Sequence, residues 1–328
     1  MAARATPGSP ISSFLTYLRA SVVGVAQVFF INNVWTGLIF LAAIFWNNPV
    51  YGVAAAIGTL AATATAYLIG ISGEDIKAGL YGFNGTLLAI ALPFFIGYGG
   101  TGQVTLWVFV VLGAALTTVI EAAFVHLLTP YRIPASTGPF VLTGWLLLAS
   151  VWAFTGLHMN TATAHLGPAA FPLVPQPGQA ITFSTVWNGF FRGIGEVMFM
   201  DNVISGALFL LGIFVGGWRG GLMAAMGAAI GVFFPALLGA NEQTIRLGLL
   251  AFNPTLTAIA VGAVFLPFSG RSVVYAFAAG LVTLVFSAAL GALLGVIGLP
   301  TLTAPFVFTM YLFIAARNVG KALNPPVP

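Results

Sequence analysis

Two matched side chains place oxygen atoms inside apolar segments of this chain. Gln27 stands in "GVAQVFF" (24–30) and Glu196 stands in "GIGEVMF" (193–199). A side-chain carbonyl oxygen accepts hydrogen bonds from N–H groups. A charge in the middle of a membrane helix costs roughly 2.5–3.5 kcal/mol on insertion scales, so an acid kept there is expected to be protonated, hydrogen-bonded or beside a polar cavity. Because the matched residue is a neutral Gln, acceptor geometry rather than charge is the shared requirement, and we expect both side chains to line a passage.

Apolar side chains are paired in the same way and are expected to form the walls of that passage. The first Phe of the set follows Gln27 or Glu196 by three positions, which predicts the same helical face. The second opens "FNGTLLAIA" (83–91) or "FNPTLTAIA" (252–260), and a Leu one turn further on would narrow the lumen. The pairs are Phe30 with Phe199, Phe83 with Phe252, and Leu87 with Leu256.

Other polar side chains are matched too. The pairs are Thr137 with Thr303, Thr143 with Thr309, and Asn84 with Asn253. Threonine in a helix often bonds its own backbone, so each Thr pair alone is a weak signal. The two Asn are expected to satisfy free backbone groups at a turn rather than to contact a solute.

The remaining acids have structural interpretations. Glu74, Asp75 and Glu242 stand at the starts of short polar segments, where a negative charge favours a helix N-terminus. Glu121 lies one turn before His126, which leaves a buried structural pair and a proton relay both open.

The composition predicts the environment of these residues. The chain has 328 residues, of which 59% are hydrophobic and 5% are charged, against about 25% charged in soluble domains. This indicates a protein that crosses the membrane several times. Nucleic acid is not an expected partner, since the net charge of +4 reads as an orientation signal at loop ends. Cysteine is absent.

An internal duplication organises the chain. "GVAQVFFINNVWTGLIFL" (24–41) and "GIGEVMFMDNVISGALFL" (193–210) share 8 of 18 residues, 169 positions apart. "GLYGFNGTLLAIAL" (79–92) and "GLLAFNPTLTAIAV" (248–261) share 9 of 14 at the same offset, and "IPASTGPFVLT" (133–143) resembles "LPTLTAPFVFT" (299–309), 166 positions apart. Small-xxx-small spacings, such as Gly227/Gly231 and Gly291/Gly295, predict close helix packing.

Apolar runs predict five membrane spans in each copy. The candidate spans are 20–46, 50–70, 83–98, 104–128, 138–157, 190–216, 220–239, 252–268, 272–296 and 304–316. An odd number of crossings means that the second copy enters from the opposite face, as an inverted repeat. Short segments with Pro or Gly breaks predict half-helices that meet near the membrane midplane. We therefore expect an all-α membrane protein with two inverted-topology five-helix repeats (1–157 and 187–328), an extracellular connector (158–186), and tilted half-helices around a central pore.

Basic residues predict the orientation, because they favour the cytoplasmic side. With both termini in the cytoplasm, most of them fall on the inner face: Arg4, Lys77, Arg132, Arg219, Arg271, Arg317 and Lys321. Arg192 and Arg246 fall on the outer face. Lys77 and Arg246 are matched in the repeat, so they are expected at opposite faces of the cell membrane.

The chemistry that fits this lining is the passage of a flat, neutral solute. The sequence has no Walker A loop, no HExxH motif and no acid–His cluster suited to a metal, so neither a cofactor nor an enzymatic reaction is expected. Aromatic faces carry partial negative charge, which suits polarised N–H groups, and paired oxygens suit a solute with many donors. Urea is planar and neutral, with four N–H donors and one carbonyl.

The doubled "GLYGFNGTLLAIALP"/"GLLAFNPTLTAIAV" blocks, with "GVAQVFF"/"GIGEVMF" and "LPTLTAPF", resemble the urea transporter family over about 24–315. The resemblance implies two inverted five-helix halves, a pore through each subunit of a homotrimer in membrane lipid, and passive conduction of urea. Carried onto this chain, it implies acceptors at the filter ends with valines beside them, aromatic slots, a central constriction and mid-pore hydroxyls. The filter-end acceptors are Gln27 and Glu196, with Val28 and Val197 beside them, and the aromatic slots are Phe30, Phe83, Phe199 and Phe252. The central constriction is Leu87 and Leu256, and the mid-pore hydroxyls are Thr137 and Thr303, with Thr143 and Thr309 in reserve.

Two other functions remain open at this stage. A channel for ammonia or a short amide needs the same slot with a different selectivity. A membrane-embedded enzyme should show a nucleophile–base set or metal ligands inside the membrane, which the sequence lacks, and a scaffold subunit has no reason to match polar residues across both halves.

Overall fold

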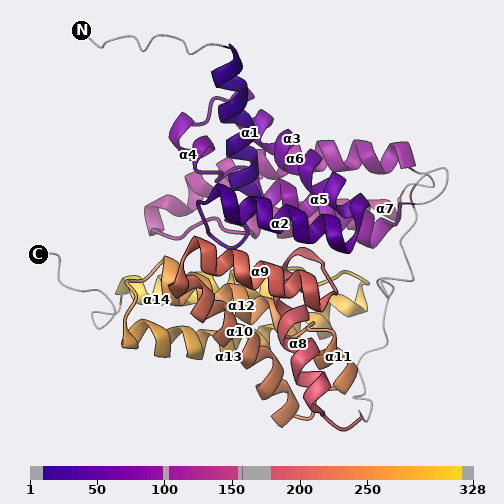
Figure 1. Ribbon diagram of the computed structural model, residues 1–328, viewed down its shortest axis with the longest axis vertical. Helices are drawn as coiled ribbons and strands as arrows, with labels where there is room; N and C mark the ends of the chain where they lie inside the picture. The colour runs from indigo at the N-terminus through magenta and orange to yellow at the C-terminus, as the bar shows by residue number, and fades with distance from the viewer. Residues whose placement is uncertain (1–9, 99–102, 154–156, 158–178, 320–328) are drawn as a thin grey trace, which may run out of the picture.

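The computed structural model describes residues 10–98, 103–153, 157 and 179–319, and regular secondary structure in these residues is helical throughout. The helices of the first half, α1–α7, lie above those of the second half, α8–α14, with α2 and α9 at the boundary (Figure 1). Most of the expected connector, 158–186, lies outside the described residues, and α8 begins within that range at Phe183.

The seven α-helices of the first half recur in the same order in the second half, whereas the 3₁₀ and π turns differ between the halves. The first half has α1 (Pro10–Gln27), α2 (Val34–Asn47), α3 (Pro49–Leu68), α4 (Gly73–Lys77), α5 (Phe83–Ile96), α6 (Gln103–Leu128), a 3₁₀ turn (Thr129–Tyr131) and α7 (Gly138–Val151). The second half has α8 (Phe183–Gly195), a 3₁₀ turn (Glu196–Met198), α9 (Val203–Gly216), α10 (Trp218–Leu237), α11 (Glu242–Arg246), α12 (Phe252–Ile259), a π-helical turn (Ala260–Val264), α13 (Gly270–Val296) and α14 (Ala304–Val319). The starts of α2, α3 and α4, at 34, 49 and 73, recur 169 positions later at 203, 218 and 242.

Two of the expected spans are interrupted. Segment 20–46 contains the end of α1 and most of α2, with residues 28–33 between them. Segment 190–216 is a pair of helices bent by 73°. The break is encoded by Asn33 and Asn202, whose side chains accept from backbone N–H groups in the first turns of α2 and α9. Each Asn thus starts a new helix where the hydrophobic run predicted a continuous one.

Within the described residues, four helices are long and apolar enough to cross a membrane: α3, α6 with its 3₁₀ turn, α10 and α13. A fifth span is obtained if the bent pair is counted as one. The short apolar helices are α2, α5, α7, α12 with its π turn, and α14. This is an all-helical membrane protein in which short helices lie beside long ones.

Reciprocal hydrogen bonds join the halves along α2 and α9. Thr36 Oγ1 donates to the Gly212 carbonyl at 2.9 Å, and its counterpart Ser205 Oγ donates to the Ala43 carbonyl at 3.0 Å. Residue 36 corresponds to 205 and residue 43 to 212, so each half makes the same bond to the other. All four residues are buried.

Glycine permits close backbone crossings in the second half. A Cβ at Gly227 would lie 2.4 Å from the Pro254 carbonyl oxygen, and one at Gly231 would lie 2.2 Å from the Ala251 Cα. These positions bring α10 against the start of α12, as the spacing predicted. At Gly291 and Gly295 a Cβ would meet no atom of the described chain within 4 Å, so close packing at this pair is not found there.

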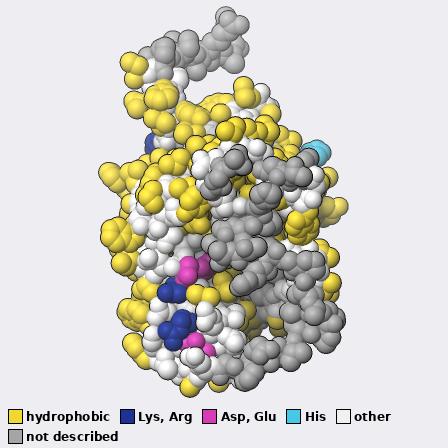
Figure 2. All heavy atoms as spheres, turned by 90° about the vertical axis from the view of Figure 1, so that its right-hand side faces the viewer, with side chains coloured by type: hydrophobic (Ala, Val, Ile, Leu, Met, Phe, Trp, Pro, Cys, Tyr) yellow, Lys and Arg dark blue, Asp and Glu magenta, His cyan; other side chains and the backbone are white. Residues whose placement is uncertain are grey.

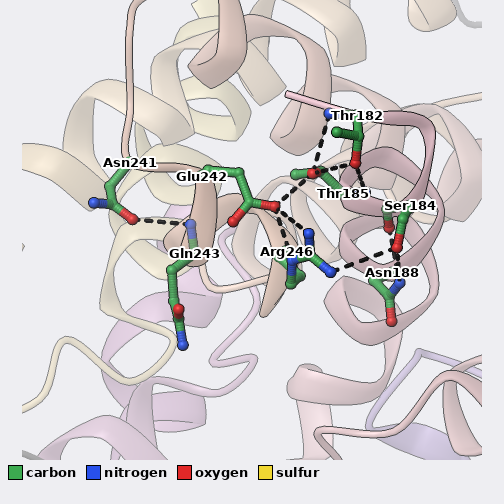
Figure 3. A network of polar contacts seen from close by, with 8 residues as sticks. All are labelled: Thr182, Ser184, Thr185, Asn188, Asn241, Glu242, Gln243 and Arg246. Carbon is green, nitrogen blue, oxygen red and sulfur yellow. Dashed lines mark hydrogen bonds and ion pairs between the residues drawn. The ribbon is translucent and has the colours of Figure 1, made fainter. Parts of the chain in front are cut away.

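Lys or Arg and Asp or Glu side chains lie close together in the lower half of Figure 2. The second half contains the ion pairs Arg192–Asp201 and Glu242–Arg246. In Figure 3, the buried Glu242 carboxylate accepts from Thr185 of α8 and from Arg246 Nε at 2.8 Å. Glu242 therefore ties α11 to the first turn of α8, beyond the helix-dipole role expected from its position.

Candidate functional site

The turns after α1 and after α8 place an aromatic ring where a helix usually ends in glycine. Ile31 N bonds the Ala26 carbonyl and Phe30 N bonds the Gln27 carbonyl, and Met200 and Phe199 repeat both bonds in the second half. This is the Schellman pattern, whose left-handed position favours glycine. Phe30 and Phe199 occupy it with φ of 62° and 63°. The expectation that each Phe continues a helical face is therefore wrong, because the helix has already ended.

Each left-handed Phe reaches rings of the opposite half. Phe30 lies 6.0 Å from Phe306 at an interplanar angle of 66°, and Phe199 lies 6.2 Å from Phe140 at 71°. Residues 140 and 306 correspond in the repeat, so the two contacts are equivalent. The edge-on packing fixes both rings at the boundary between the halves and leaves them half-buried.

Gln27 and Glu196 lie at the ends of α1 and α8, both only 9% exposed. Gln27 Nε2 donates to the Ala78 carbonyl at 2.6 Å. That bond orients the amide and leaves its Oε1 as an acceptor. The flanking Val28 and Val197 are fully buried.

The short helices α5 and α12 carry the Phe and Leu pairs. Phe83 and Phe252 begin these helices, and Leu87 and Leu256 lie one turn on with no exposed surface. Leu87 and Leu256 are both part of the main apolar core, which extends through the two halves.

The paired Asn side chains clamp backbone groups, as expected. Asn84 Nδ2 donates to the Ser136 carbonyl at 3.1 Å, and its Oδ1 accepts from Phe140 N at 3.2 Å. Asn253 makes the matching bonds, to the Leu302 carbonyl at 3.2 Å and from Phe306 N at 3.3 Å. Each Asn thus fixes the loop that precedes α7 or α14 to the start of α5 or α12.

The clamped loops bring two predicted hydroxyls into direct contact. Thr137 Oγ1 and Thr303 Oγ1 lie 2.7 Å apart and are buried. Bonds from the matched residues Tyr311 and Trp145 flank them: Tyr311 Oη donates to the Ala135 carbonyl and Trp145 Nε1 to the Pro300 carbonyl, both at 2.8 Å, with acceptors one position out of register. The reserve pair behaves differently, because Thr143 and Thr309 each bond a carbonyl of their own helix.

A cavity of about 370 Å³ collects three of the predicted residues: Gln27, Phe30 and Phe83. Its wall includes Val264 and Phe265 from the second half. The lining runs from exposed residues, such as Asp75 and Thr129, to buried ones, such as Gln27 and Phe83. The cavity is therefore a vestibule that leads from the surface to the boundary between the halves. The other nine predicted residues are not among those that line it: Val28, Leu87, Thr137, Glu196, Val197, Phe199, Phe252, Leu256 and Thr303.

Five polar residues of this vestibule were not among the predicted site residues: Asp75, Tyr81, Glu121, Thr129 and Ser136. Glu121 is 4% exposed and accepts from Asn84 Nδ2 at 3.0 Å, whereas His126 is exposed. A Glu121–His126 pair is therefore not found. The available signal was the position of Asn84 and Ser136 in the two matched motifs, which the tertiary fold brings beside Glu121.

Among the described residues, no group of three or more His, Cys, Asp or Glu side chains is arranged to hold a metal ion. The vestibule instead offers amide, carboxyl and hydroxyl groups beside aromatic rings. This set is suited to hydrogen bonding with a small polar solute.

Comparisons with known proteins agree with this chemistry. A family model described as "Urea transporter" matches residues 18–318. The chain is 27% identical over 293 residues to "Urea transporter 1" of Ovis aries, which covers 89% of this chain and 74% of that protein. It is 30% identical over 298 residues to "Urea transporter 1" of Rattus norvegicus and of Mus musculus, with the same coverage.

Proposed function

The chain belongs to the urea transporter family, and from this premise we propose that it conducts urea passively through a narrow passage between its two halves. Membership places it among transporters rather than enzymes, and its apolar helices make it a multi-pass membrane protein. The proposed passage has acceptors at its two ends and aromatic and aliphatic side chains between them.

The vestibule is the observation that carries this proposal. It brings Gln27 and Phe30, from the end of α1 and its following turn, and Phe83, from the start of α5, to one mouth next to residues of the second half. The repeat then assigns Glu196, Phe199 and Phe252 to a second mouth. Between the two mouths, Leu87 and Leu256 form the proposed constriction and Thr137 and Thr303 supply hydroxyls at the junction of the halves.

The selectivity follows from the cost of removing water from the solute. A buried polar group loses free energy unless its hydrogen bonds are replaced. Gln27, the threonine hydroxyls and Glu196 offer replacement acceptors for the N–H groups of urea, while phenylalanine rings admit its flat faces. These groups cannot replace the water molecules around a hydrated ion, so we expect ions to be excluded from the passage.

The wider arrangement is proposed on the same basis. The two halves are inverted repeats, 1–157 and 187–328, joined by an extracellular connector, with both termini on the cytoplasmic side of the cell membrane. The placement of the basic residues supports this orientation. We further propose a homotrimer in membrane lipid, with one passage in each subunit, as the family resemblance implies.

Solute flux into vesicles tests the function. Purified protein in liposomes should accelerate the osmotic reswelling that follows urea entry, independently of membrane voltage, and should not accelerate salt entry. Phe83→Ala or Leu256→Ala should admit larger amides, while Leu112→Ala, on the exposed side of α6, should not. Urea entry equal to that of protein-free vesicles would refute the proposal, and ammonia or acetamide entry without urea entry would assign the passage to that solute.

A further inference from the structure

The mouth that contains Gln27 differs from its repeat counterpart in two polar positions. The comparison requires the register of α6 against α13, which the buried positions provide. In α6 these are Leu106, Val110, Gly113, Ala114, Thr117, Thr118 and Glu121, and in α13 they are Ser272, Ala276, Ala279, Gly280, Thr283 and Leu284. The first six buried positions of α6 match the six buried positions of α13 at an offset of 166. At this offset the counterpart of Glu121 is residue 287.

The carboxyl group of each mouth comes from a different element. At the first mouth the residue at the end of α1 is Gln27, and the carboxyl belongs to Glu121 of α6. In the second half the corresponding residues are Glu196 and Ser287. Ser287 Oγ bonds the Thr283 carbonyl of its own helix at 2.9 Å. The first mouth therefore has two side-chain acceptors, Gln27 Oε1 and the Glu121 carboxyl, on separate helices.

Ser136 supplies the second difference. Its side chain lines the vestibule and is 6% exposed, and its Oγ has no hydrogen-bond partner among the described residues. Its counterpart is Leu302, and both residues have φ of 50°. A buried hydroxyl without a partner destabilises the fold, and a left-handed backbone adds strain. Because the apolar Leu302 has the same strained backbone, it is the unpartnered hydroxyl of Ser136 that indicates a role toward a ligand.

The three groups have complementary donor and acceptor character. One of the two N–H groups of the Gln27 amide is bonded to Ala78, and Asn84 donates to the Glu121 carboxyl and the Ser136 carbonyl. The Ser136 O–H has no partner among the described residues, so this cavity holds an unpaired hydroxyl donor together with the Gln27 and Glu121 acceptors. Urea presents the opposite set, with N–H donors on both sides of one carbonyl acceptor.

We propose that Glu121 and Ser136 form a binding subsite in the vestibule, beside Gln27, for a small neutral solute of the urea class. Glu121 and Gln27 accept the N–H groups of the solute, and Ser136 donates to its carbonyl oxygen. The subsite exists at one mouth only, and the proposal rests on the urea-conducting function proposed above.

Saturation of solute flux tests the subsite, with thiourea as the second probe because sulfur is a weak acceptor. In Ser136→Ala the half-saturating urea concentration should rise about three- to tenfold, which corresponds to one lost hydrogen bond, and that of thiourea should rise much less. Glu121→Gln keeps an oxygen for Asn84 but removes one acceptor, so both solutes should bind more weakly. Ser287→Ala, the matched control, should change neither value.

Thermal unfolding of each variant separates binding from folding. Ser136→Ala should unfold no lower than the wild type, because its hydroxyl bonds nothing in the described chain. An unchanged half-saturating urea concentration in Ser136→Ala, or an equal shift for urea and thiourea, would overturn the role of Ser136, and unchanged values in Glu121→Gln would remove that residue from the subsite. Failure of the wild type to conduct urea would instead contradict the proposed function.

Discussion

Phe30 and Phe199 hold a backbone conformation that disfavours side chains. The left-handed region costs a residue with a Cβ about 1–2 kcal/mol, and both halves accept this cost at the same position. Matched strain of this kind favours a functional reason for the side chain over a structural one. The reason proposed here is the placement of a ring at each mouth.

A pair of substitutions at Phe30 separates the ring from the strain. Phe30→Ala and Phe30→Gly both remove the ring, but only Gly relieves the backbone strain. Phe30→Gly should therefore be more stable than Phe30→Ala by about 1 kcal/mol. Both should discriminate less between urea and N-methylated ureas in vesicle flux. Leu38 in α2 is a control position, where Leu38→Ala should be more stable than Leu38→Gly because Ala favours a helix interior. Greater thermal stability of Phe30→Ala would contradict the strained turn.

At the scale of elements, the asparagine clamps connect the short helices to the loops that carry Thr137 and Thr303. Asn253 satisfies two backbone groups, whereas Asn84 satisfies two backbone groups and the Glu121 carboxyl. The first half therefore depends on its clamp more than the second half does.

Replacing the clamps should show this difference. Asn253→Ala should lower the free energy of unfolding by about 1–3 kcal/mol, the cost of leaving buried polar groups unpaired. Asn84→Ala should cost more, because it also leaves a buried carboxyl without its partner. Denaturant unfolding in detergent measures both, and an equal or smaller loss in Asn84→Ala would contradict the extra role of Asn84.

The Glu242 network predicts a pH dependence at α11, which lies beyond the end of α10. The hydrogen bond from Thr185, and then the hydrogen bond and charge of Arg246, hold the pKa of the Glu242 carboxyl below its usual value despite burial. A carboxyl with a lowered folded-state pKa stabilises the fold above its unfolded pKa of about 4.3. That stabilisation is lost as the pH falls through the lower folded value.

Melting temperatures measured from neutral pH to below pH 4 should show the loss. The wild type should lose more stability on acidification than Glu242→Gln, which has no carboxyl to protonate at this position. Parallel melting curves for the two proteins over the whole range would show that the network does not stabilise the charged form.

The sequence predicts elements better than it predicts their interruptions. The apolar runs at 83–98, 138–157, 252–268 and 304–316 located α5, α7, α12 and α14, but they predicted full spans where the structure has shorter helices. The apolar runs at 20–46 and 190–216 predicted single spans, because hydropathy does not register an Asn that starts a new helix inside a run. Helical spacing likewise placed Phe30 on the face of Gln27, although the chain turns between them.

The site was predictable where the repeat doubles it and obscure where the halves differ. Gln27, Phe30 and Phe83 were recognised as members of matched pairs, and they share the vestibule. Glu121 and Ser136 have no counterpart of the same kind that signals them, since Glu121 corresponds to Ser287, which has no carboxyl group, and Ser136 corresponds to the apolar Leu302. Only the tertiary contacts through Asn84 bring them together.

At the scale of the whole molecule, the two halves contact each other through residues that are matched in the repeat. Thr36 and Ser205, and likewise Phe30 and Phe199, make equivalent contacts with the other half, and the matched Trp145 and Tyr311 each donate to a backbone carbonyl of the other half. Thr137 and Thr303 meet each other. Such pairing supports a two-fold relation between the halves, from which the proposed inversion in the membrane follows if each half has an odd number of crossings.

The cysteine-free chain allows one measurement to test inversion, lining and conduction together. Gln27→Cys and Glu196→Cys, each in sealed vesicles of known orientation, are exposed to a membrane-impermeant thiol reagent while urea flux is recorded. Two opposed mouths of one urea passage predict block of Gln27→Cys only from the face of Lys77 and block of Glu196→Cys only from the opposite face. Block of both variants from the same face, or undiminished urea flux in both, would contradict a passage shared by inverted halves.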